Sequence, residues 1–271
     1  MTVLDDLNAG VREDMAARQR LVTLAELKEH AAAAAPARDA WAALGGPSAR
    51  DRLQVIAEIK RRSPSKGDLA SIADPASLAV QYADGGAAVI SVLTEQRRFN
   101  GSLADLDAVR AAVDVPLLRK DFMIDEYQIW EARAHGADLI LLIVASLSDA
   151  QLREYSALSR DLGMNVLVET HTAGEIERAV AADAKIIGVN VRNLKTLDVD
   201  RSVFADLAAG IPAGALVVGE SGVRGVDDVR HYAASGANAV LVGEALVSDA
   251  TPRERIAEFT AAGAEEIAAR S

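Results

Sequence analysis

Short apolar runs alternate with longer amphipathic segments over most of the chain. Several of the runs contain almost no polar residue, which is typical of parallel strands that are covered on both faces. The segments between them are rich in Ala, Leu, Glu and Arg and have the length and spacing of helices. We therefore predict eight strands, at residues 55–60, 88–93, 116–120, 139–144, 165–169, 186–191, 216–219 and 239–242.

Glycine-alanine pairs at three of the predicted helix-to-strand junctions support this alternation. Gly86-Ala87, Gly136-Ala137 and Gly236-Ala237 each follow a helical segment and precede a strand. Glycine readily adopts the left-handed conformation that ends many helices, so each pair is expected to mark a helix C-terminus. Strands that alternate regularly with helices form parallel sheets. The chain is therefore predicted to be an α/β protein whose eight units close into a (β/α)8 TIM barrel.

A doubly wound open sheet is the alternative arrangement for alternating strands and helices. That fold predicts a glycine-rich turn directly after the first strand. The sequence there is Lys60-Arg61-Arg62-Ser63-Pro64-Ser65, which contains no glycine and favours the barrel.

The residues before the first strand are additional to the barrel and form a predicted helical extension. Apolar residues recur at helical spacing from position 3 to position 11, and Thr23-Leu24-Ala25-Glu26 matches a capping box that opens a second helix. Gly45-Gly46-Pro47 ends this region. We predict one domain over residues 1–271, with the extension at 1–47 and the barrel at 48–271. The extension is expected to cover the bottom of the barrel or to overhang its top, and the sequence leaves both options open.

Composition and charge narrow the classes of partner. The formal net charge is −11, with 29 Lys and Arg against 40 Asp and Glu, which argues against nucleic acid as a partner. Local positive charge can still bind an anionic small molecule. The chain has no cysteine, which excludes disulfides, thiolate nucleophiles and cysteine-ligated metals. Half of the residues are hydrophobic, so a large core is available.

The expected location is the cytoplasm. No apolar stretch reaches the ~18 residues that suggest a membrane span, and the first six residues lack the basic and apolar pattern of a signal peptide. We expect no membrane partner and a monomer, with a weak dimer as the alternative.

Polar side chains recur at the end of six of the predicted strands. Active sites of TIM barrels lie at the C-terminal ends of the strands. Glu58 and Lys60 are two residues apart in the first strand, so both side chains are expected to point to the same side. A single charge at a strand end most often marks solvent exposure, but the recurrence of polar residues at six strand ends favours a functional site. The other ends are Arg119-Lys120-Asp121-Phe122, Glu169, Asn190-Val191-Arg192-Asn193, Gly219-Glu220-Ser221-Gly222 and Gly243-Glu244.

Lys120 and Glu169 are the strongest candidates for an acid–base pair. Enclosure and positive neighbours can lower the pKa of a lysine toward neutrality and make it a usable proton donor. His171 follows Glu169 by two residues and is a weaker candidate, because such a histidine is more often a loop residue. The remaining histidines fall in helical segments with no pairing that resembles a metal site, so no metal is expected.

The loops after the seventh and eighth predicted strands form a candidate phosphate site. In many barrels these loops bind phosphate through backbone N–H groups and the N-terminus of a short helix. Glycine lets the backbone approach an anion closely, although both loops also fit the alternative of ordinary turns. The side chains of Glu220 and Glu244 would have to point away from the anion. The candidate phosphate-binding residues are Ser63, Lys66, Ser221, Gly222, Gly243 and Glu244.

The motifs at these strand ends resemble those of indole-3-glycerol-phosphate synthases. The ordered set covers all eight strands and the N-terminal extension and is far more specific than any one motif. Trp130 and Val223 stand where Tyr and Ile are expected, and no catalytic position is substituted. The matching motifs are Glu58-Ile59-Lys60-Arg61-Arg62-Ser63-Pro64-Ser65, Ser91-Val92-Leu93-Thr94-Glu95, Phe99-Asn100-Gly101-Ser102-Leu103, Leu118-Arg119-Lys120-Asp121-Phe122, Val168-Glu169-Thr170-His171, Gly188-Val189-Asn190-Val191-Arg192-Asn193-Leu194 and Gly219-Glu220-Ser221-Gly222.

The resemblance implies a specific reaction of tryptophan biosynthesis. The substrate would be 1-(2-carboxyphenylamino)-1-deoxyribulose 5-phosphate, a sugar phosphate with an anthranilate moiety. The ring carbon that bears the carboxylate attacks the ribulose carbonyl, CO₂ and then water leave, and indole-3-glycerol phosphate forms. The family uses no metal and no organic cofactor.

The resemblance also implies the role of each residue. Lys120 would protonate the carbonyl oxygen, Glu169 would remove the final proton, and Lys60 would bind the substrate carboxylate and assist dehydration. How the two lysines divide the proton steps stays open. Glu58 would hold Lys60 or Lys120 and share in proton transfer. Asn190 and Arg192 would orient the hydroxyls and charges of the substrate, and Phe122 and Leu142 would pack near its aromatic ring. The phosphate would be held by Ser63, Ser221, Gly222, Gly243 and the backbone of Glu244.

Other functions fit the same barrel. A Schiff-base aldolase would use Lys120 or Lys60 as a nucleophile. A sugar-phosphate isomerase needs no site for a substrate carboxylate, so the two strand-end lysines argue mildly against it. A catalytically silent barrel that binds sugar phosphates would show degraded chemistry at the strand ends.

Overall fold

The computed structural model describes residues 3–46, 52–194 and 196–269, so the predicted boundary at 47/48 lies outside the described residues. Within them, eight parallel strands close into a barrel in the order β1-β10-β9-β8-β7-β6-β5-β4. Each predicted strand is confirmed to within one residue at either end. The barrel strands are β1 (Gln54–Ile59), β4 (Val89–Leu93), β5 (Leu117–Lys120), β6 (Leu139–Ile143), β7 (Asn165–Thr170), β8 (Ile186–Asn190), β9 (Leu216–Glu220) and β10 (Ala239–Val242).

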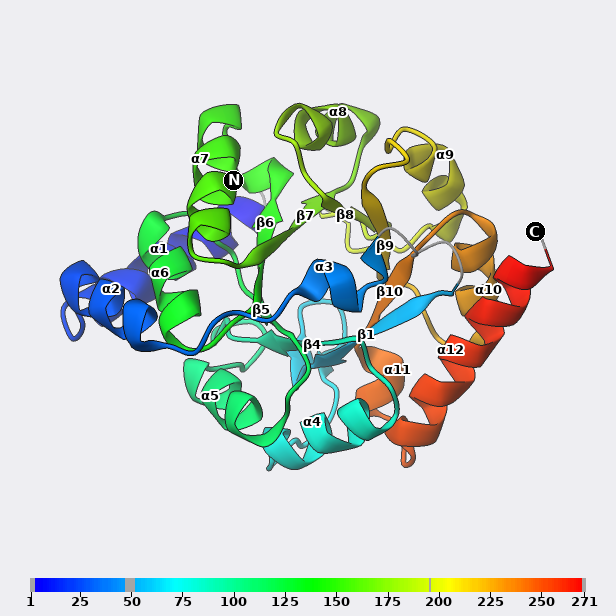
Figure 1. Cartoon of the computed structure of the whole chain (residues 1–271), viewed down its shortest axis with the longest axis horizontal. Helices are drawn as coiled ribbons and strands as arrows, with labels where there is room; N and C mark the ends of the chain where they lie inside the picture. Colours follow the sequence, from blue (N-terminus) through cyan, green and yellow to red (C-terminus); the bar gives the residue numbers. More distant parts are fainter. Residues whose placement is uncertain (1–2, 47–51, 195, 270–271) are drawn as a thin grey trace.

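A ring of helices surrounds the barrel (Figure 1). Two short strands, β2 (Arg62–Ser63) and β3 (Gly67–Asp68), form a hairpin after β1. The helices are α1 (Val3–Gln19), α2 (Leu24–Ala33), α3 (Ala40–Ala43), α4 (Pro75–Asp84), α5 (Leu103–Ala112), α6 (Glu126–Ala134), α7 (Asp149–Asp161), α8 (Ala173–Ala181), α9 (Phe204–Ala208), α10 (Val226–Ala234), α11 (Glu244–Val247) and α12 (Pro252–Ala268), with 3-10 turns at Val144–Ser146 and Arg201–Val203.

The alternation of side chains along each strand divides the core into two parts. Val55 and Ala57 of β1 pack in the layer between the barrel and its helices. Ile56, between them in sequence, packs with inward side chains of the other strands inside the barrel. Glu58 follows Ile56 on the inner side, as the period of two predicts. Apolar side chains therefore fill the middle of the barrel. The charged side chains of Glu58, Lys120, Glu169 and Glu220 gather at its C-terminal end.

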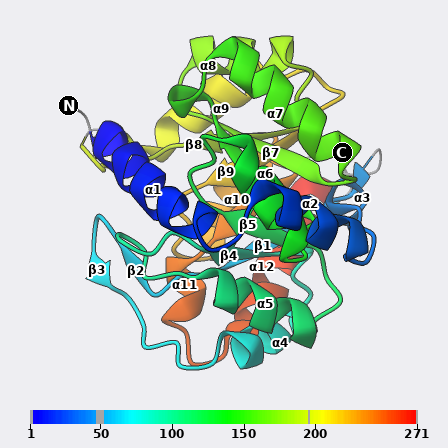
Figure 2. The same ribbon diagram turned by 90° about the vertical axis from the view of Figure 1, so that its left-hand side faces the viewer.

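The extension covers both ends of the barrel. Ala40 and Leu44, in and just after α3, are fully buried against the interior cluster at the bottom. At the opposite end, Leu4 and Leu7 of α1 line the cavity of the barrel mouth. Figure 2 shows α1 and the β2–β3 hairpin at one end of the molecule and α3 at the other. The sequence left open whether the extension covers the bottom of the barrel or overhangs its top. In the structure α3 covers the bottom, and α1 lies at the top.

Local signals in the sequence explain where the elements end. Thr23 and Glu26 form the predicted capping box at the start of α2. Gly86, Gly136 and Gly236 have φ angles of 91°, 77° and 92°, which confirms the left-handed conformation expected at the three Gly-Ala pairs. Within residues 3–46, 52–194 and 196–269, no helix combines the length and the apolar character that crossing a membrane requires.

We predict that Leu44→Ala lowers the free energy of unfolding by about 2–5 kcal/mol, because it removes a buried side chain and leaves a cavity. Chemical denaturation measures this loss. Leu21→Ala is the matched control, since Leu21 is 83% exposed and should change stability by no more than about 0.5 kcal/mol. Turnover of both variants at 25 °C should equal that of the parent protein, because α3 lies at the end of the barrel away from the mouth. An unchanged stability for Leu44→Ala would contradict the packing of this residue.

Candidate active site

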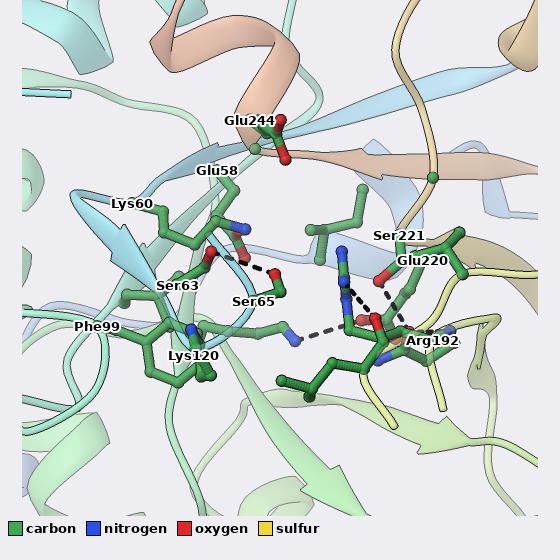
Figure 3. A pocket seen from close by; sticks show the side chains of 18 of the residues that line it. Glu58, Lys60, Ser63, Ser65, Phe99, Lys120, Arg192, Glu220, Ser221 and Glu244 are labelled. Carbon is green, nitrogen blue, oxygen red and sulfur yellow. Dashed lines mark hydrogen bonds and ion pairs between the residues drawn. The ribbon is translucent and has the colours of Figure 1, made fainter. Parts of the chain in front are cut away.

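One large cavity opens at the C-terminal ends of the strands, with a volume of about 470 Å³. Figure 3 shows the side chains that point into it from the barrel and its loops. The structure thus gathers twelve of the thirteen residues to which the resemblance assigns a role around one opening. They are Glu58, Lys60, Ser63, Lys120, Phe122, Glu169, Asn190, Arg192, Ser221, Gly222, Gly243 and Glu244.

Leu142 is the exception, and its expected place beside an aromatic ring is wrong. Its side chain is fully buried in the layer between the barrel and the helices. Leu141 and Ile143, its neighbours in β6, point inward and line the cavity instead. The physical reason is the alternation of the strand, which sends Leu142 to the outer side.

Lys60 and Glu58 form an ion pair at the end of β1. Lys60 Nζ lies 2.6 Å from Glu58 Oε1, and the two side chains are 19% and 4% exposed. Both line the cavity, as the period-two spacing predicts. A Cβ atom at Gly243 would lie 2.5 Å from Glu58 Oε1, so only glycine leaves room for this pair at the start of the last loop. The pair therefore presents an ammonium group on the wall of the cavity.

Lys120 lies between two carboxylates contributed by different strands. Its Nζ is 3.1 Å from Glu169 Oε2 and 3.3 Å from Glu220 Oε2. Burial opposes the charge of the ammonium, but Glu169, Glu220 and Glu58 outweigh burial and raise the pKa of Lys120. The expected lowering of this pKa toward neutrality is thus wrong, because the neighbours of Lys120 are negative rather than positive. Lys120 is a charged group that can stabilise negative charge and release a proton to a strong base.

Glu169 is the ionised carboxylate of the cluster. Burial alone would favour its neutral form, yet Lys120, His171 and Asn190 outweigh burial and lower its pKa below the ordinary range. Asn190 Nδ2 donates a hydrogen bond of 3.1 Å to Glu169 Oε1. Ser221 Oγ in turn donates to Asn190 Oδ1 at 2.8 Å, and the backbone N–H of Arg192 donates to the same oxygen at 3.1 Å. The amide is therefore fixed in the orientation that gives its N–H to Glu169.

Glu220 is a site residue that the sequence did not assign. It was expected to point away from a bound anion, and its side chain points toward Lys120 on the inner side of β9. Burial and the charge of Glu169 raise its pKa to about 8, against the opposing effect of Lys120. The alternation of side chains along β9 could have predicted this position. Leu216 and Val218 face the barrel interior, and Glu220 follows them at the same spacing of two.

His171 lies behind Glu169, at the end of β7. Its Nε2 is 3.3 Å from Glu169 Oε1, and its Nδ1 is 3.2 Å from Glu175 Oε2 on α8. Burial opposes a charge on the ring, but the two carboxylates outweigh burial and raise the pKa of His171 to about 10. The sequence favoured a loop residue, and His171 does follow the last residue of β7, but its side chain is only 9% exposed and belongs to the charged cluster.

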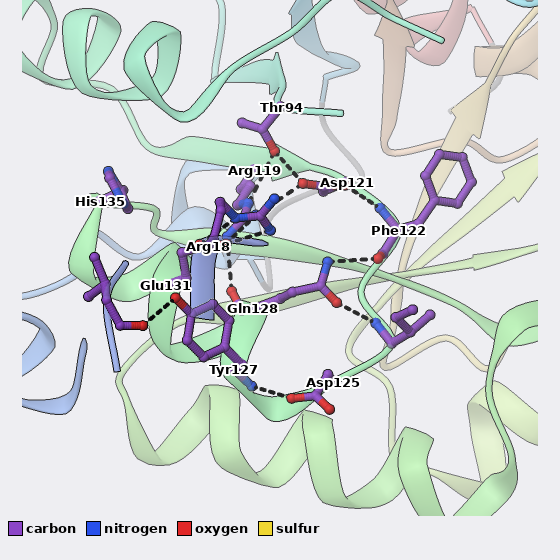
Figure 4. A network of polar contacts seen from close by, with 12 residues as sticks. Arg18, Thr94, Arg119, Asp121, Phe122, Asp125, Tyr127, Gln128, Glu131 and His135 are labelled. Carbon is purple, nitrogen blue, oxygen red and sulfur yellow. Dashed lines mark hydrogen bonds and ion pairs between the residues drawn. The ribbon is translucent and has the colours of Figure 1, made fainter. Parts of the chain in front are cut away.

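A buried polar network supports the strand that carries Lys120 (Figure 4). Arg119 is fully buried on the outer side of β5, where its Nη2 lies 3.0 Å from Asp121 Oδ2 and 2.8 Å from Glu131 Oε2. Glu131 also accepts a 2.7 Å bond from Arg18 Nε of α1, which ties the extension to the network. Asp121 accepts the backbone N–H of Phe122 at 2.9 Å. These bonds fix the residues on either side of Lys120.

The loops after β9 and β10 form part of the cavity rim. Ser221 and Gly222 have φ angles of 68° and 79°. The hydroxyl of Tyr232 donates a 2.8 Å bond to the carbonyl of Ser221, which holds this turn from behind. Across the opening, Lys66 pairs with Glu244 at the start of α11. The rim thus combines a constrained backbone turn with one flexible lysine.

An aromatic wall lies beside Lys120. The rings of Phe99 and Phe122 are 6.2 Å apart between centroids and tilted by 39°. Leu4 and Leu7 of α1 also line this cavity, which adds an apolar surface contributed by the extension. In the described part of the chain, no group of three or more His, Cys, Asp or Glu side chains is arranged to hold a metal ion.

We predict that Glu220→Gln changes how stability depends on pH. A carboxyl with a pKa near 8 when folded and about 4.3 when unfolded binds its proton more tightly in the folded state. Its stabilising effect is complete below the unfolded pKa and is lost as the pH rises through about 8. The melting temperature of the parent protein should therefore fall relative to that of Glu220→Gln between pH 5 and pH 9. Parallel melting curves over this range would show that Glu220 does not hold a proton.

Comparisons with known proteins show the family of the chain. The family model described as indole-3-glycerol phosphate synthase matches residues 4–259. The chain is 86% identical over 271 residues to the indole-3-glycerol phosphate synthase of Arthrobacter sp. (strain FB24), with 100% of both chains covered. It is 80% identical over 272 residues to that of Paenarthrobacter aurescens (strain TC1), again with 100% of both covered.

Two solved structures with low sequence identity share the fold of the chain. The 3-hexulose-6-phosphate synthase from Salmonella typhimurium superposes with a TM-score of 0.63 at 14% identity, over 79% of this chain and 100% of that one. The thiamine phosphate pyrophosphorylase from Pyrococcus furiosus gives a TM-score of 0.60 at 15% identity, over 80% and 98%. The fold alone does not separate these activities, whereas the family model and the two close relatives agree on one: the chain belongs to the indole-3-glycerol phosphate synthase family.

Proposed function

We propose that this protein converts 1-(2-carboxyphenylamino)-1-deoxyribulose 5-phosphate into indole-3-glycerol phosphate, CO₂ and water. The observation that carries this proposal is the contact between Lys120 and Glu169, 3.1 Å apart, in a cavity that also contains Lys60 and the constrained turn at Gly222. A proton donor, a base and two anion-binding positions are the groups that the reaction needs. Membership of the family supports the same assignment.

Ring closure begins when the anthranilate carbon attacks the ribulose carbonyl. Negative charge then develops on the carbonyl oxygen, and a buried ammonium stabilises such charge better than water does. Lys120 is the group for this step, because its pKa is raised and it remains charged until the oxygen becomes basic enough to take the proton. Phe99 and Phe122 would hold the aromatic ring near Lys120.

Loss of CO₂ and water completes the indole. Lys60 would bind the substrate carboxylate at first, and its pair with Glu58 keeps its ammonium at the cavity wall. It then donates the proton that lets the hydroxyl leave as water, and Glu169 accepts the last ring proton. The substrate trianion takes up one proton overall, since the carboxylate leaves as neutral CO₂ and the phosphate keeps its charge.

The far rim would hold the phosphate. Backbone N–H groups of Gly222, Gly243 and Glu244, with the hydroxyls of Ser221 and Ser63, line that side of the cavity. Lys66 would exchange its pairing with Glu244 for the phosphate, and Arg192 would orient the sugar hydroxyls. All of these groups come from one chain, so we propose that the monomer is active. Sedimentation of the protein under assay conditions tests this state.

The experiment that tests the function is turnover by the purified protein. Indole-3-glycerol phosphate should appear as a rise in indole fluorescence after the substrate is added. We propose no covalent enzyme intermediate, which separates this activity from a Schiff-base aldolase. Treatment with borohydride and a carbonyl substrate should leave the mass of the protein unchanged. An adduct on Lys120 or Lys60 would favour the aldolase instead, and binding without turnover would favour a silent barrel.

We predict that Lys120→Ala lowers turnover by at least ~10²-fold, the lower range for the loss of a general acid. The fluorescence assay under substrate saturation measures this effect. Lys185→Ala is the control, because Lys185 is 59% exposed and pairs with Asp183 in the loop before β8. Its turnover should match the parent value. Normal turnover by Lys120→Ala would remove Lys120 from the chemistry.

We also predict that Gly222→Ala raises KM by about 5–30-fold, because a left-handed conformation costs a non-glycine residue roughly 1–2 kcal/mol. Its Cβ would also lie 3.0 Å from side-chain atoms of Val199 and Arg201, so the turn must shift. Gly214→Ala is the matched control, since no atom lies within 4 Å of the added Cβ. Steady-state kinetics with both variants give the two constants. An unchanged KM for Gly222→Ala would argue against a phosphate at this turn.

A further inference from the structure

The acidic cluster around Lys120 has more carboxylates than one ammonium can neutralise. Glu169 and Glu220 both contact Lys120 Nζ, and their side chains are only 3% and 2% exposed. A buried charge without a partner is costly, so the two carboxylates compete for the same cation. When two acids share a site in this way, one of them keeps a proton. The reaction needs that proton to reside on Glu220, because Glu169 must be free to act as the base.

The surroundings of Glu169 and Glu220 differ, because the ring of His171 lies beside Glu169. Glu169 contacts Lys120 and the amide of Asn190. Its Oε1 lies 3.3 Å from His171 Nε2, which is an ion-pair distance without hydrogen-bond geometry, so this nitrogen is a buried atom with no hydrogen-bond partner within the residues that the structure describes. Glu220 contacts Lys120, and its Oε1 is a buried atom with no hydrogen-bond partner among the described residues. That oxygen faces Gly188, where a Cβ atom would lie 2.0 Å away. The ring of His171 and the amide of Asn190 thus separate the two acids, and of these two groups only the ring can carry a charge.

Glu175 holds His171 in this position from the side of α8. Its Oε2 accepts the backbone N–H of His171 at 2.7 Å and lies 3.2 Å from the ring Nδ1. A ring with a carboxylate at each nitrogen is stabilised in its doubly protonated form. The raised pKa of His171, about 10, agrees with this geometry.

We propose that His171, held by Glu175, is a positioning residue that places the negative charge of the cluster on Glu169 and leaves the proton on Glu220. This inference rests on the proposed role of Glu169 as the base. The charged groups that face the ring are Glu169 on β7 and Glu175 on α8, and Lys120 on β5 lies on the far side of Glu169. His171 acts through Glu169 and needs no contact with the substrate.

Replacement of His171 by a neutral side chain makes the proton affinities of Glu169 and Glu220 more similar. Glu169 then holds the shared proton more often, and the fraction of protein with an ionised base falls at a given pH. An opposite charge within about 4–6 Å shifts a carboxyl pKa by roughly one to three units. The acid limb of kcat/KM should therefore move to higher pH by about one unit or more when the ring becomes neutral.

The pH profile of kcat/KM for His171→Gln and His171→Lys tests this proposal. Gln keeps a polar side chain and removes the charge, so its acid limb should lie at higher pH than that of the parent protein. Lys restores a cation between the two carboxylates, so its acid limb should return toward the parent position. His135→Gln is the matched control, because His135 pairs with Asp107 on the helix layer and should leave the profile unchanged. Melting temperatures of all three variants establish that they are folded at 25 °C.

Nitrogen NMR of histidine-labelled protein gives a second, independent measurement. The signal that disappears in His171→Gln identifies His171, and it should have the shift of a doubly protonated ring at pH 7.5. A neutral ring at this pH overturns the proposal, as does an acid limb that stays in place in His171→Gln. An equal displacement in His171→Gln and His171→Lys also overturns it, since shape rather than charge would then be responsible. If the parent protein shows no turnover, the proposed function fails, and the NMR signal still tests the charge on His171.

Discussion

The contact of one buried ammonium with two carboxylates is the interaction on which the site depends. Lys120, Glu169 and Glu220 come from β5, β7 and β9, and only a closed barrel brings these strands' inner faces together. The residue two positions earlier in each strand, Leu118, Leu167 or Val218, is packed in the barrel interior. This apolar layer lies deeper in the barrel than the three charged side chains and excludes water from that side. Strong pairing is then required, because buried charges without partners would destabilise the barrel.

The strand β5 carries charge on both of its faces. Lys120 points into the mouth, while Arg119 points outward into a network with Asp121 and Glu131. Every Arg119 nitrogen bears a hydrogen bond, which a fully buried guanidinium requires. The network extends through Glu131 to Arg18 of α1. One strand thus connects the acid–base cluster to the helix layer and to the extension, and its position is fixed from both sides.

The sequence predicts the barrel and most of the site, because strand boundaries and a period of two determine which side chains meet at the mouth. It fails where that information is missing. All five residues of β6 are apolar, so hydropathy does not show which of them face the barrel interior. The position of Leu142 could therefore not be predicted from hydropathy. Glu220 was missed because the strand was predicted to end one residue early. The pKa of Lys120 depends on distances to Glu169 and Glu220 that spacing along the chain does not contain.

The extension and the local charge balance illustrate the same limit. An amphipathic helix indicates that one face is buried and leaves open what covers it, so α1 and α3 could be placed at opposite ends only by their contacts. The net charge of −11 likewise says little about the mouth. There, the carboxylates of Glu58, Glu169 and Glu175 are matched by Lys60, Lys120 and the His171 ring, and Glu220 keeps its proton in the proposed arrangement, so the wall nearest the reacting atoms is close to neutral. An anionic substrate is therefore repelled less by this wall than the net charge of the whole chain would suggest.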